Sequence, residues 1–142
     1  MKVLVSACLL GENCKYSGGN NLDPRVAEWL RENGHEAVPV CPEALGGLPT
    51  PRTPAEIAGG VVTARDGRSV DAEFRRGAAL ALEIARREGV ELAVLQPRSP
   101  SCGARQIYDG TFSGRLIDGQ GVFARLLADN GFQVREPEEL KS

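Results

Sequence analysis

The sequence opens with Lys2-Val3-Leu4-Val5-Ser6-Ala7-Cys8-Leu9-Leu10-Gly11, an apolar run that passes into small residues and a cysteine. Short apolar runs that are rich in valine and bounded by small residues are typical of a strand buried on both faces. The loop that follows, residues 7–20, is rich in glycine and polar residues and carries a second cysteine, Cys14. The pattern therefore predicts a buried strand at residues 2–6 that ends in a cysteine-bearing loop.

Strand and helix patterns alternate along the rest of the chain. Further strands are predicted at residues 36–40, 91–95 and 132–134, and helices at residues 23–34, 71–89 and 121–130. Asp23 and Asp71 are the expected N-caps of the first two helices, because an aspartate side chain accepts hydrogen bonds from free N–H groups at a helix start. Strands that alternate with helices indicate an α/β fold with a mainly parallel sheet covered on both faces. We expect one domain, residues 1–142, with a Rossmann-like sheet of about four strands.

Two segments fall outside this alternation. Residues 61–64 and 68–70 flank Asp66-Gly67, a turn sequence that predicts a small hairpin insertion. Residues 97–119 are predicted to form a long loop, and its serine, cysteine, tyrosine and glycine content favours an ordered functional loop over a disordered one.

Composition restricts the possible functions and partners. Seventeen Lys and Arg against 19 Asp and Glu give a net charge of −2, so the basic surface that duplex nucleic acid requires is not expected. No apolar run approaches the ~20 residues of a membrane span, and the first residues enter a strand pattern instead of a signal peptide. We therefore expect a cytoplasmic protein. In that reducing compartment, four cysteines indicate metal binding or catalysis more often than disulfides.

The cysteines follow the predicted strands. Cys8 lies two residues after the first strand, Cys41 directly after the second, and Cys102 in the loop after the third. The carboxyl ends of parallel strands meet at one edge of a sheet, which is where such folds bind ligands. Three thiols from separate parts of the sequence should therefore converge, and Cys14 could join them or lie just outside.

Several kinds of site could use these thiols. A zinc site usually takes closely spaced cysteine pairs, whereas Cys8 and Cys14 are separated by five residues. An iron–sulfur cluster tolerates dispersed ligands, and a cluster held by three cysteines leaves one iron open for catalysis. A cysteine nucleophile would need a base, yet His35 precedes the second strand, at the opposite edge from Cys41. Buried, inert cysteines are the remaining alternative.

Three blocks of sequence surround these cysteines. They are Val5-Ser6-Ala7-Cys8-Leu9-Leu10-Gly11 with Cys14-Lys15-Tyr16, then Pro39-Val40-Cys41-Pro42-Glu43 with Gly46-Gly47-Leu48-Pro49-Thr50-Pro51-Arg52, then Ser99-Pro100-Ser101-Cys102-Gly103 with Tyr108-Asp109-Gly110-Thr111-Phe112. In this order they resemble the thiouracil desulfidase family, over nearly the whole chain.

The resemblance implies an enzyme with a [4Fe-4S] cluster bound by Cys8, Cys41 and Cys102, which leaves one iron open. The implied reaction is a non-redox hydrolysis that replaces the C=S group of thiouracil with C=O and releases sulfide, the open iron accepting the substrate sulfur. The implied partner is a small thiopyrimidine. A non-enzymatic zinc- or cluster-binding domain is the alternative, and it would use all four thiols, Cys14 included.

Proton transfer in such a reaction needs a carboxylate or hydroxyl group near the thiols. Glu43 is the expected acid/base, with Ser99 as its hydroxyl partner and Ser101 as the less favoured choice. The alternative for Glu43 is a salt bridge to Arg52 or Arg98. The alternative for each serine is a hydrogen bond within a turn, which serine beside proline often makes.

Further residues could contact substrate or cluster. Ser6 could bond a cluster sulfide or the substrate, and Tyr108 and Asp109 could contact the pyrimidine, although Asp109-Gly110 equally reads as a turn. Lys15 and Arg52 could contact a substrate phosphate, but cations of this kind are more often solvated at the surface.

Overall fold

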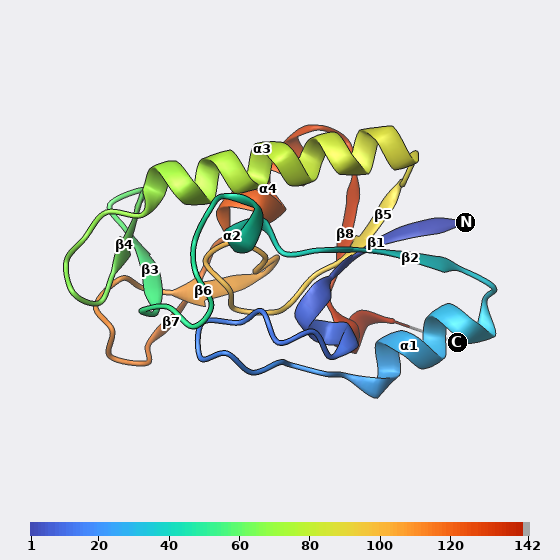
Figure 1. The fold of residues 1–142 in the computed structure, drawn as a ribbon, viewed down its shortest axis with the longest axis horizontal. Coiled ribbons are helices and arrows are strands. Elements are labelled where there is room, and N and C mark those ends of the chain that lie inside the picture. Colours follow the sequence, from blue (N-terminus) through green and yellow to red (C-terminus); the bar gives the residue numbers. More distant parts are fainter. Residues whose placement is uncertain (141–142) are drawn as a thin grey trace.

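Four parallel strands form the central sheet of the computed structural model, which describes residues 1–140 (Figure 1). The sheet order is β2-β1-β5-β8. The strands are β1 (Lys2–Ser6), β2 (Glu36–Val40), β5 (Leu92–Val94) and β8 (Gln133–Arg135). Each predicted strand is present within one or two residues of its expected place, so the predicted α/β class and parallel sheet are confirmed.

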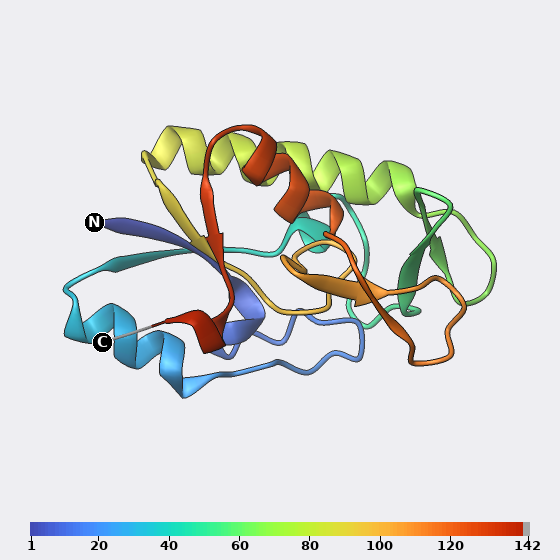
Figure 2. The ribbon, with the colours of Figure 1, turned by 180° about the vertical axis from the view of Figure 1, so that it is seen from behind.

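Helices cover both faces of the sheet. Helices α3 and α4 lie on one face and α1 on the other, as Figures 1 and 2 show from opposite sides. The helices are α1 (Pro24–Glu32), α2 (Pro42–Leu45), α3 (Asp71–Glu88) and α4 (Val122–Asp129), with the short 3-10 helices η1 (Ala7–Leu10) and η2 (Pro137–Glu139). None of the helices in residues 1–140 has the length and apolar character that a membrane crossing requires.

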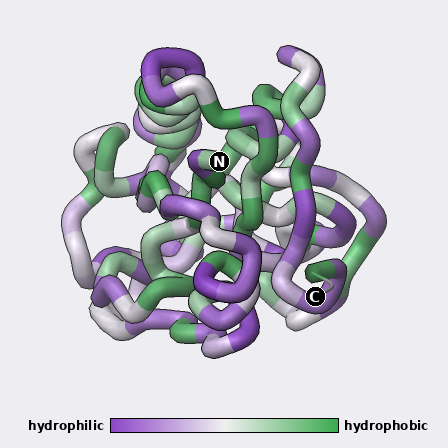
Figure 3. Tube along the Cα trace, turned by 90° about the vertical axis from the view of Figure 1, so that its right-hand side faces the viewer, coloured by the Kyte–Doolittle hydropathy of each residue, from purple (hydrophilic) through white to green (hydrophobic). Residues whose placement is uncertain are grey.

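Strand β1 is buried on both faces, which explains its unbroken apolar run. Leu4 packs into the core cluster that α3 and α4 cover, whereas Val3 and Val5 pack into the cluster on the other face, together with Trp29 of α1. In Figure 3 the hydrophobic stretches run through the middle of the molecule and hydrophilic ones occupy many of the outer turns. Successive side chains of a strand point to opposite faces, so the middle of a central parallel strand is apolar on both faces, and the polar residues Lys2 and Ser6 stand at its two ends.

The predicted hairpin differs from the observed one. Strand β4 (Val61–Ala64) pairs mainly with β3 (Ala55–Ala58), which was not predicted. The expected pairing across Asp66-Gly67 is present only as the single bridge between Thr63 and Ser69. The Ala-Glu-Ile-Ala sequence of β3 has little apolar alternation, so sequence patterning gave no strand there.

The segment 97–119 is not entirely loop. It contains a second small hairpin, β6 (Gln106–Tyr108) paired with β7 (Leu116–Asp118). All three residues of β7 are exposed, so this strand carries no buried face that could mark it in the sequence.

Asp71 does not cap α3 in the predicted way. It is the first residue of the helix, and Val70 occupies the N-cap position. The Asp71 carboxylate instead accepts a hydrogen bond from the Val62 N–H group of β4 at 3.0 Å and pairs with Arg75 at 2.7 Å. The Asp71 carboxylate, which was expected to cap the N-terminus of α3, therefore links the β3–β4 hairpin to this helix instead.

Helices α2 and α3 approach so closely that two glycines meet their partner's backbone. A Cβ atom on Gly77 of α3 would overlap the carbonyl oxygen of Pro42, and one on Gly46 would overlap that of Glu73. This contact fixes the position of α2, which directly follows Cys41.

We expect Gly77→Ala to lower the stability of the protein by roughly 1–3 kcal/mol, because α2 must move to admit the methyl group. At an unhindered helix position the same change would add about 1 kcal/mol. Urea unfolding followed by circular dichroism measures the effect, with Gly19→Ala as the matched control, since its Cβ would meet only Ser17 Oγ at 3.5 Å. An unchanged or higher midpoint for Gly77→Ala would contradict the close contact.

Candidate active site

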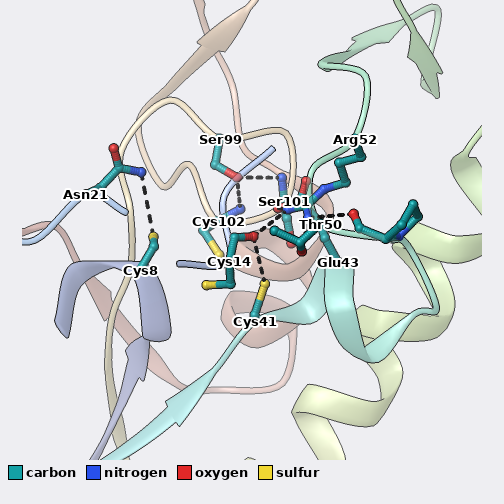
Figure 4. A network of polar contacts seen from close by, with 11 residues as sticks. Cys8, Cys14, Asn21, Cys41, Glu43, Thr50, Arg52, Ser99, Ser101 and Cys102 are labelled. Carbon is teal, nitrogen blue, oxygen red and sulfur yellow. Dashed lines mark hydrogen bonds and ion pairs between the residues drawn. The ribbon is translucent and has the colours of Figure 1, made fainter. Parts of the chain in front are cut away.

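The carboxyl ends of three neighbouring strands bring three cysteines to one cavity. Cys8 lies in η1 directly after β1, Cys41 follows β2, and Cys102 lies in the loop after β5. Residues Ser6 and Val40 pair at the ends of β1 and β2, so the first two cysteines leave the sheet side by side. All three line a cavity of about 680 Å³, and the predicted convergence is therefore present (Figure 4). Cys14 lines the same cavity.

The outer wall of the cavity comes from the two hairpins. Tyr108 and Phe112 line it from the β6–β7 hairpin and its connecting loop, and Arg65 and Arg68 line it from the turn after β4. The cavity therefore has a thiol-lined floor at the sheet edge and an aromatic and basic outer part. Its volume falls within the roughly 300–1,000 Å³ that small-molecule sites occupy.

Burial makes the thiols of Cys8, Cys14 and Cys102 weaker acids, because it raises their pKa values. Burial raises the pKa of Cys102, and a hydrogen bond from Ser6 opposes that rise only in part. Burial also raises the pKa of Cys8, and burial together with the neighbouring Cys41 raises that of Cys14 to about 12. All four cysteines are free. A metal centre that binds here must displace protons from these thiols, as metal binding to thiols generally does.

The donor set suits an iron–sulfur cluster better than a single ion. Within residues 1–140, no three His, Cys, Asp or Glu side chains are grouped closely enough to hold one metal ion. A cluster is larger than an ion, so its thiolate ligands stand farther apart, and thiolates are its usual ligands. In the cavity wall, Arg52 Nε and Gln96 Oε1 are buried polar atoms that form no hydrogen bond with any group of residues 1–140. The residues present therefore fit an iron–sulfur cluster. The thiols could bind its iron atoms, and the two unsatisfied polar atoms could form hydrogen bonds with a molecule bound beside it.

Glu43 and Arg52 form a buried pair beside the thiols. The Arg52 side chain is 6% exposed and its Nη2 lies 3.5 Å from Glu43 Oε2, so the expectation of a solvated surface arginine is wrong. The same nitrogen donates to the Cys14 carbonyl oxygen at 2.9 Å. Burial raises the pKa of Glu43, and Arg52 opposes this shift in part. The alternative of a salt bridge is therefore realised, and it holds the Glu43 carboxyl group at the cavity.

The two candidate serines differ in their surroundings. Ser99 Oγ accepts hydrogen bonds from the N–H groups of Ser101 and Cys102, each at 3.0 Å. Two acceptor bonds use both lone pairs of a hydroxyl, which leaves the Ser99 O–H hydrogen free to donate, and Ser99 lines the cavity. Ser101 Oγ is buried and has no hydrogen-bond partner in the described part of the chain, and Ser101 lies behind the cavity wall.

The loop that carries Cys102 is fastened to the start of α4. The N–H groups of Val122 and Phe123 donate to the carbonyl oxygens of Pro100 and Ser101, each at 2.8 Å. The first N–H groups of a helix have no partner within it, so the cysteine loop satisfies them. A Cβ on Gly121 would clash with the Ser101 backbone, so this junction requires glycine.

Other predicted residues take mixed positions. Ser6 lines the cavity and its Oγ accepts from the Gln96 N–H group at 2.9 Å. Tyr108 also lines the cavity. The Asp109 carboxylate instead accepts hydrogen bonds from Thr111, which lower the pKa of Asp109 and close the turn that its sequence suggested.

Two residues of the site were not found from the sequence. Asn21 donates to Cys8 Sγ at 3.7 Å. Glu56 of β3 accepts from the N–H groups of Gly110 and Phe112, which ties the two hairpins together while Phe112 keeps a left-handed backbone with φ 57°. No spacing or motif identifies either residue in the sequence, because each forms its hydrogen bonds with residues that are distant along the chain.

Comparisons with known proteins agree over the whole chain. Residues 3–139 match the model of the family described as 2-thiouracil desulfurase. A relative from Bacillus subtilis (strain 168), the uncharacterized protein YbbK, is 41% identical over 149 aligned positions, which cover 97% of each chain. A solved structure, described as the [4Fe-4S]-dependent thiouracil desulfidase TudS, is 43% identical and matches with a TM-score of 0.91 over 98% of this chain and 92% of that one. The family resemblance and the fold are therefore confirmed.

We expect Arg52→Met to destabilise the protein by about 3 kcal/mol, because it leaves the buried Glu43 carboxylate without its partner. Adding Glu43→Gln should recover roughly 1 kcal/mol or more of that loss, as coupled neighbours do. Urea unfolding of the two single variants and the double variant measures the coupling. Arg68→Met, which removes an exposed pair with Asp66, is the control and should change stability by less than about 1 kcal/mol. Strictly additive losses would show that the Glu43–Arg52 contact contributes nothing.

Proposed function

The chain belongs to the 2-thiouracil desulfurase family, and we propose that it converts a thiouracil and water to uracil and sulfide with the help of a [4Fe-4S] cluster. One observation carries this proposal: three thiols from separate strand ends and a largely buried carboxyl group, that of Glu43, line the same cavity. The TudS match, described as [4Fe-4S]-dependent, supports the choice of cofactor. The size of the cavity supports a small-molecule thiopyrimidine as substrate.

Cys8, Cys41 and Cys102 are the proposed cluster ligands, and Cys14 is left outside the ligand set. With three protein ligands, a bound cluster supplies one open iron, a soft Lewis acid that suits a thiocarbonyl sulfur. Cys14 is placed differently, because its carbonyl oxygen receives Arg52 and the Cys41 thiol, the latter at 3.7 Å. Its backbone thus helps to hold Arg52 and Cys41 in position.

Glu43 is the proposed acid/base. Overall, a water molecule exchanges its oxygen for the substrate sulfur, and both of its protons leave with that sulfur, so no electrons are consumed. The Glu43 carboxylate accepts the first proton as water adds to the carbon, and it returns that proton to the departing sulfide. A carboxyl group whose pKa is raised by burial binds a proton more readily than an exposed one, which suits this role.

Ser99 is the proposed donor to the substrate. Its two acceptor sites are filled by backbone N–H groups, so it can offer only its hydrogen to a group in the cavity. Such a donor would orient the polar edge of a pyrimidine beside the thiols. Ser101 is not assigned a catalytic role, because its hydroxyl is buried behind the cavity wall.

Protein loaded with iron and sulfide without oxygen should release one sulfide for each 2-thiouracil or 4-thiouracil converted. Cys8→Ser, Cys41→Ser and Cys102→Ser should each abolish turnover, whereas Cys14→Ser should keep most of it. Methylene-blue detection of sulfide with chromatography of uracil measures both products. A fully loaded wild type that releases no sulfide from thiouracils or their nucleosides would refute the proposed activity.

A non-enzymatic metal-binding domain is the second candidate. The observation that favours it is the fourth thiol, Cys14, which lines the cavity close to Cys41. A closed site would use all four thiols, so Cys14→Ser should then reduce metal content as much as Cys8→Ser does. Unchanged metal content in Cys14→Ser would remove this alternative.

Glu43→Gln should slow turnover by roughly 100- to 10,000-fold, the usual contribution of general acid–base catalysis, while the metal content stays at the wild-type level. Ser99→Ala should also lower the rate, and Ser101→Ala serves as the matched control with a wild-type rate. The three variants are compared by steady-state kinetics on protein of equal iron content. A Ser101→Ala variant that is as slow as Ser99→Ala would contradict the assignment of the donor.

A further inference from the structure

Asn21 contacts Cys8 at two points. Its backbone N–H group donates to the Cys8 carbonyl oxygen at 3.0 Å, and its side-chain Nδ2 donates to Cys8 Sγ at 3.7 Å. The first contact fixes the backbone of η1 and the second fixes the direction of the sulfur, as Figure 4 shows. Asn21 is thirteen residues from Cys8 along the chain, so these two hydrogen bonds hold the end of the intervening loop against Cys8.

Lys15 determines which way the Asn21 amide faces. Its Nζ lies 3.3 Å from Asn21 Oδ1. An ammonium group can only donate hydrogen bonds, so the amide oxygen must face Lys15 and the amide NH₂ must face the sulfur. The positive charge also polarises the amide and strengthens its donation, as charge-assisted hydrogen bonds do. Two hydrogen bonds therefore link Lys15 to Cys8 through Asn21: the Lys15 ammonium group donates to the amide oxygen, and the amide NH₂ group donates to the Cys8 sulfur.

The three candidate ligands differ in what their sulfur atoms meet. Cys8 receives an amide N–H group and Cys102 a hydrogen bond from Ser6, whereas Cys41 Sγ faces the carbonyl oxygen of Cys14, which can only accept a hydrogen bond. Donors to a ligating sulfur stabilise its electron density, and they thereby raise the reduction potential of an iron–sulfur cluster and strengthen its attachment. Among these contacts, the Asn21 amide is the one that would act on Cys8 in this way.

We propose that Asn21, oriented by Lys15, is a positioning residue that holds the Cys8 sulfur and withdraws electron density from it when the cluster is bound. The proposal rests on the proposed function, because it takes Cys8 as a cluster ligand. With a cluster bound, withdrawal of charge from this ligand would make the iron a better Lewis acid, so the same contact should support the rate as well as retention of the cluster.

The test compares wild type with Asn21→Leu, Asn21→Asp, Lys15→Met and Lys15→Arg, all loaded without oxygen. Asn21→Asp keeps the shape and the contact with Lys15 but replaces the N–H donor with a second oxygen. Asn13→Ala is the matched control, because Asn13 lies in the same loop and only accepts from Asn20 at 2.9 Å. The readouts are the midpoint potential of the cluster and the rate at which a chelator removes iron.

We expect a more negative potential and about tenfold faster iron loss in Asn21→Leu, the lower end of the 10- to 100-fold effects that such outer contacts have. Asn21→Asp should shift the potential at least as far, and Lys15→Met less far. Lys15→Arg and Asn13→Ala should match wild type. If Asn21→Leu fails to fold by circular dichroism, Asn21→Asp and Lys15→Met carry the same test.

A loaded wild type and Asn21→Asp with equal potentials and equal iron loss would overturn this inference and leave the proposed function standing. Equal shifts in Asn13→Ala and Asn21→Leu would also overturn it, because they would reflect loosening of the loop alone. A wild type that binds no cluster would overturn the proposed function, and the inference with it.

Discussion

The site depends on the parallel pairing of β1 with its neighbours β2 and β5. Parallel strands run in one direction, so whatever follows each of them must emerge at the same edge. The pairing of Ser6 with Val40 and of Val5 with Val94 sets how far each strand extends, and hence where Cys8, Cys41 and the Cys102 loop begin. Cys8 and Cys41, 33 residues apart, are thus brought to one edge by strand pairing, and Cys102, a further 61 residues along, reaches the same cavity through a loop held by Ser99 and by the start of α4.

Chemical groups that are costly to bury gather at this edge. The anionic forms of a thiol and of a carboxyl group are less stable when buried than in water, and burial accordingly raises the pKa of Cys8, Cys102 and Glu43. The surrounding structure offsets this cost with oriented donors, namely Arg52 at Glu43 and Asn21 at Cys8. An arrangement of this kind is typical of a functional site, because ionisable groups with shifted pKa values cluster where binding or catalysis needs them.

The sheet and its helices were predictable because burial imposes strong periodic patterns. The apolar run at Val3 to Val5 and the buried face of α3 repeat at strand and helix spacing, and both are where the sequence placed them. The convergence of Cys8, Cys41 and Cys102 was predictable because the carboxyl ends of parallel strands lie at one edge of the sheet. The hairpins β3–β4 and β6–β7 are short and partly exposed, so they lack such patterns. The Glu43–Arg52 salt bridge was foreseen as one alternative, but the burial of Arg52 and the role of Asn21 were not, because an isolated polar residue has no sequence signature until the fold gives it a partner.

We propose that the thiols at this edge hold an iron–sulfur cluster. The most direct measurement is the iron, zinc and acid-labile sulfide content of protein purified without oxygen. We predict about four irons and four sulfides per chain, as a [4Fe-4S] cluster requires, with no zinc. One zinc per chain and no iron would contradict this proposal and make the centre a structural metal site instead.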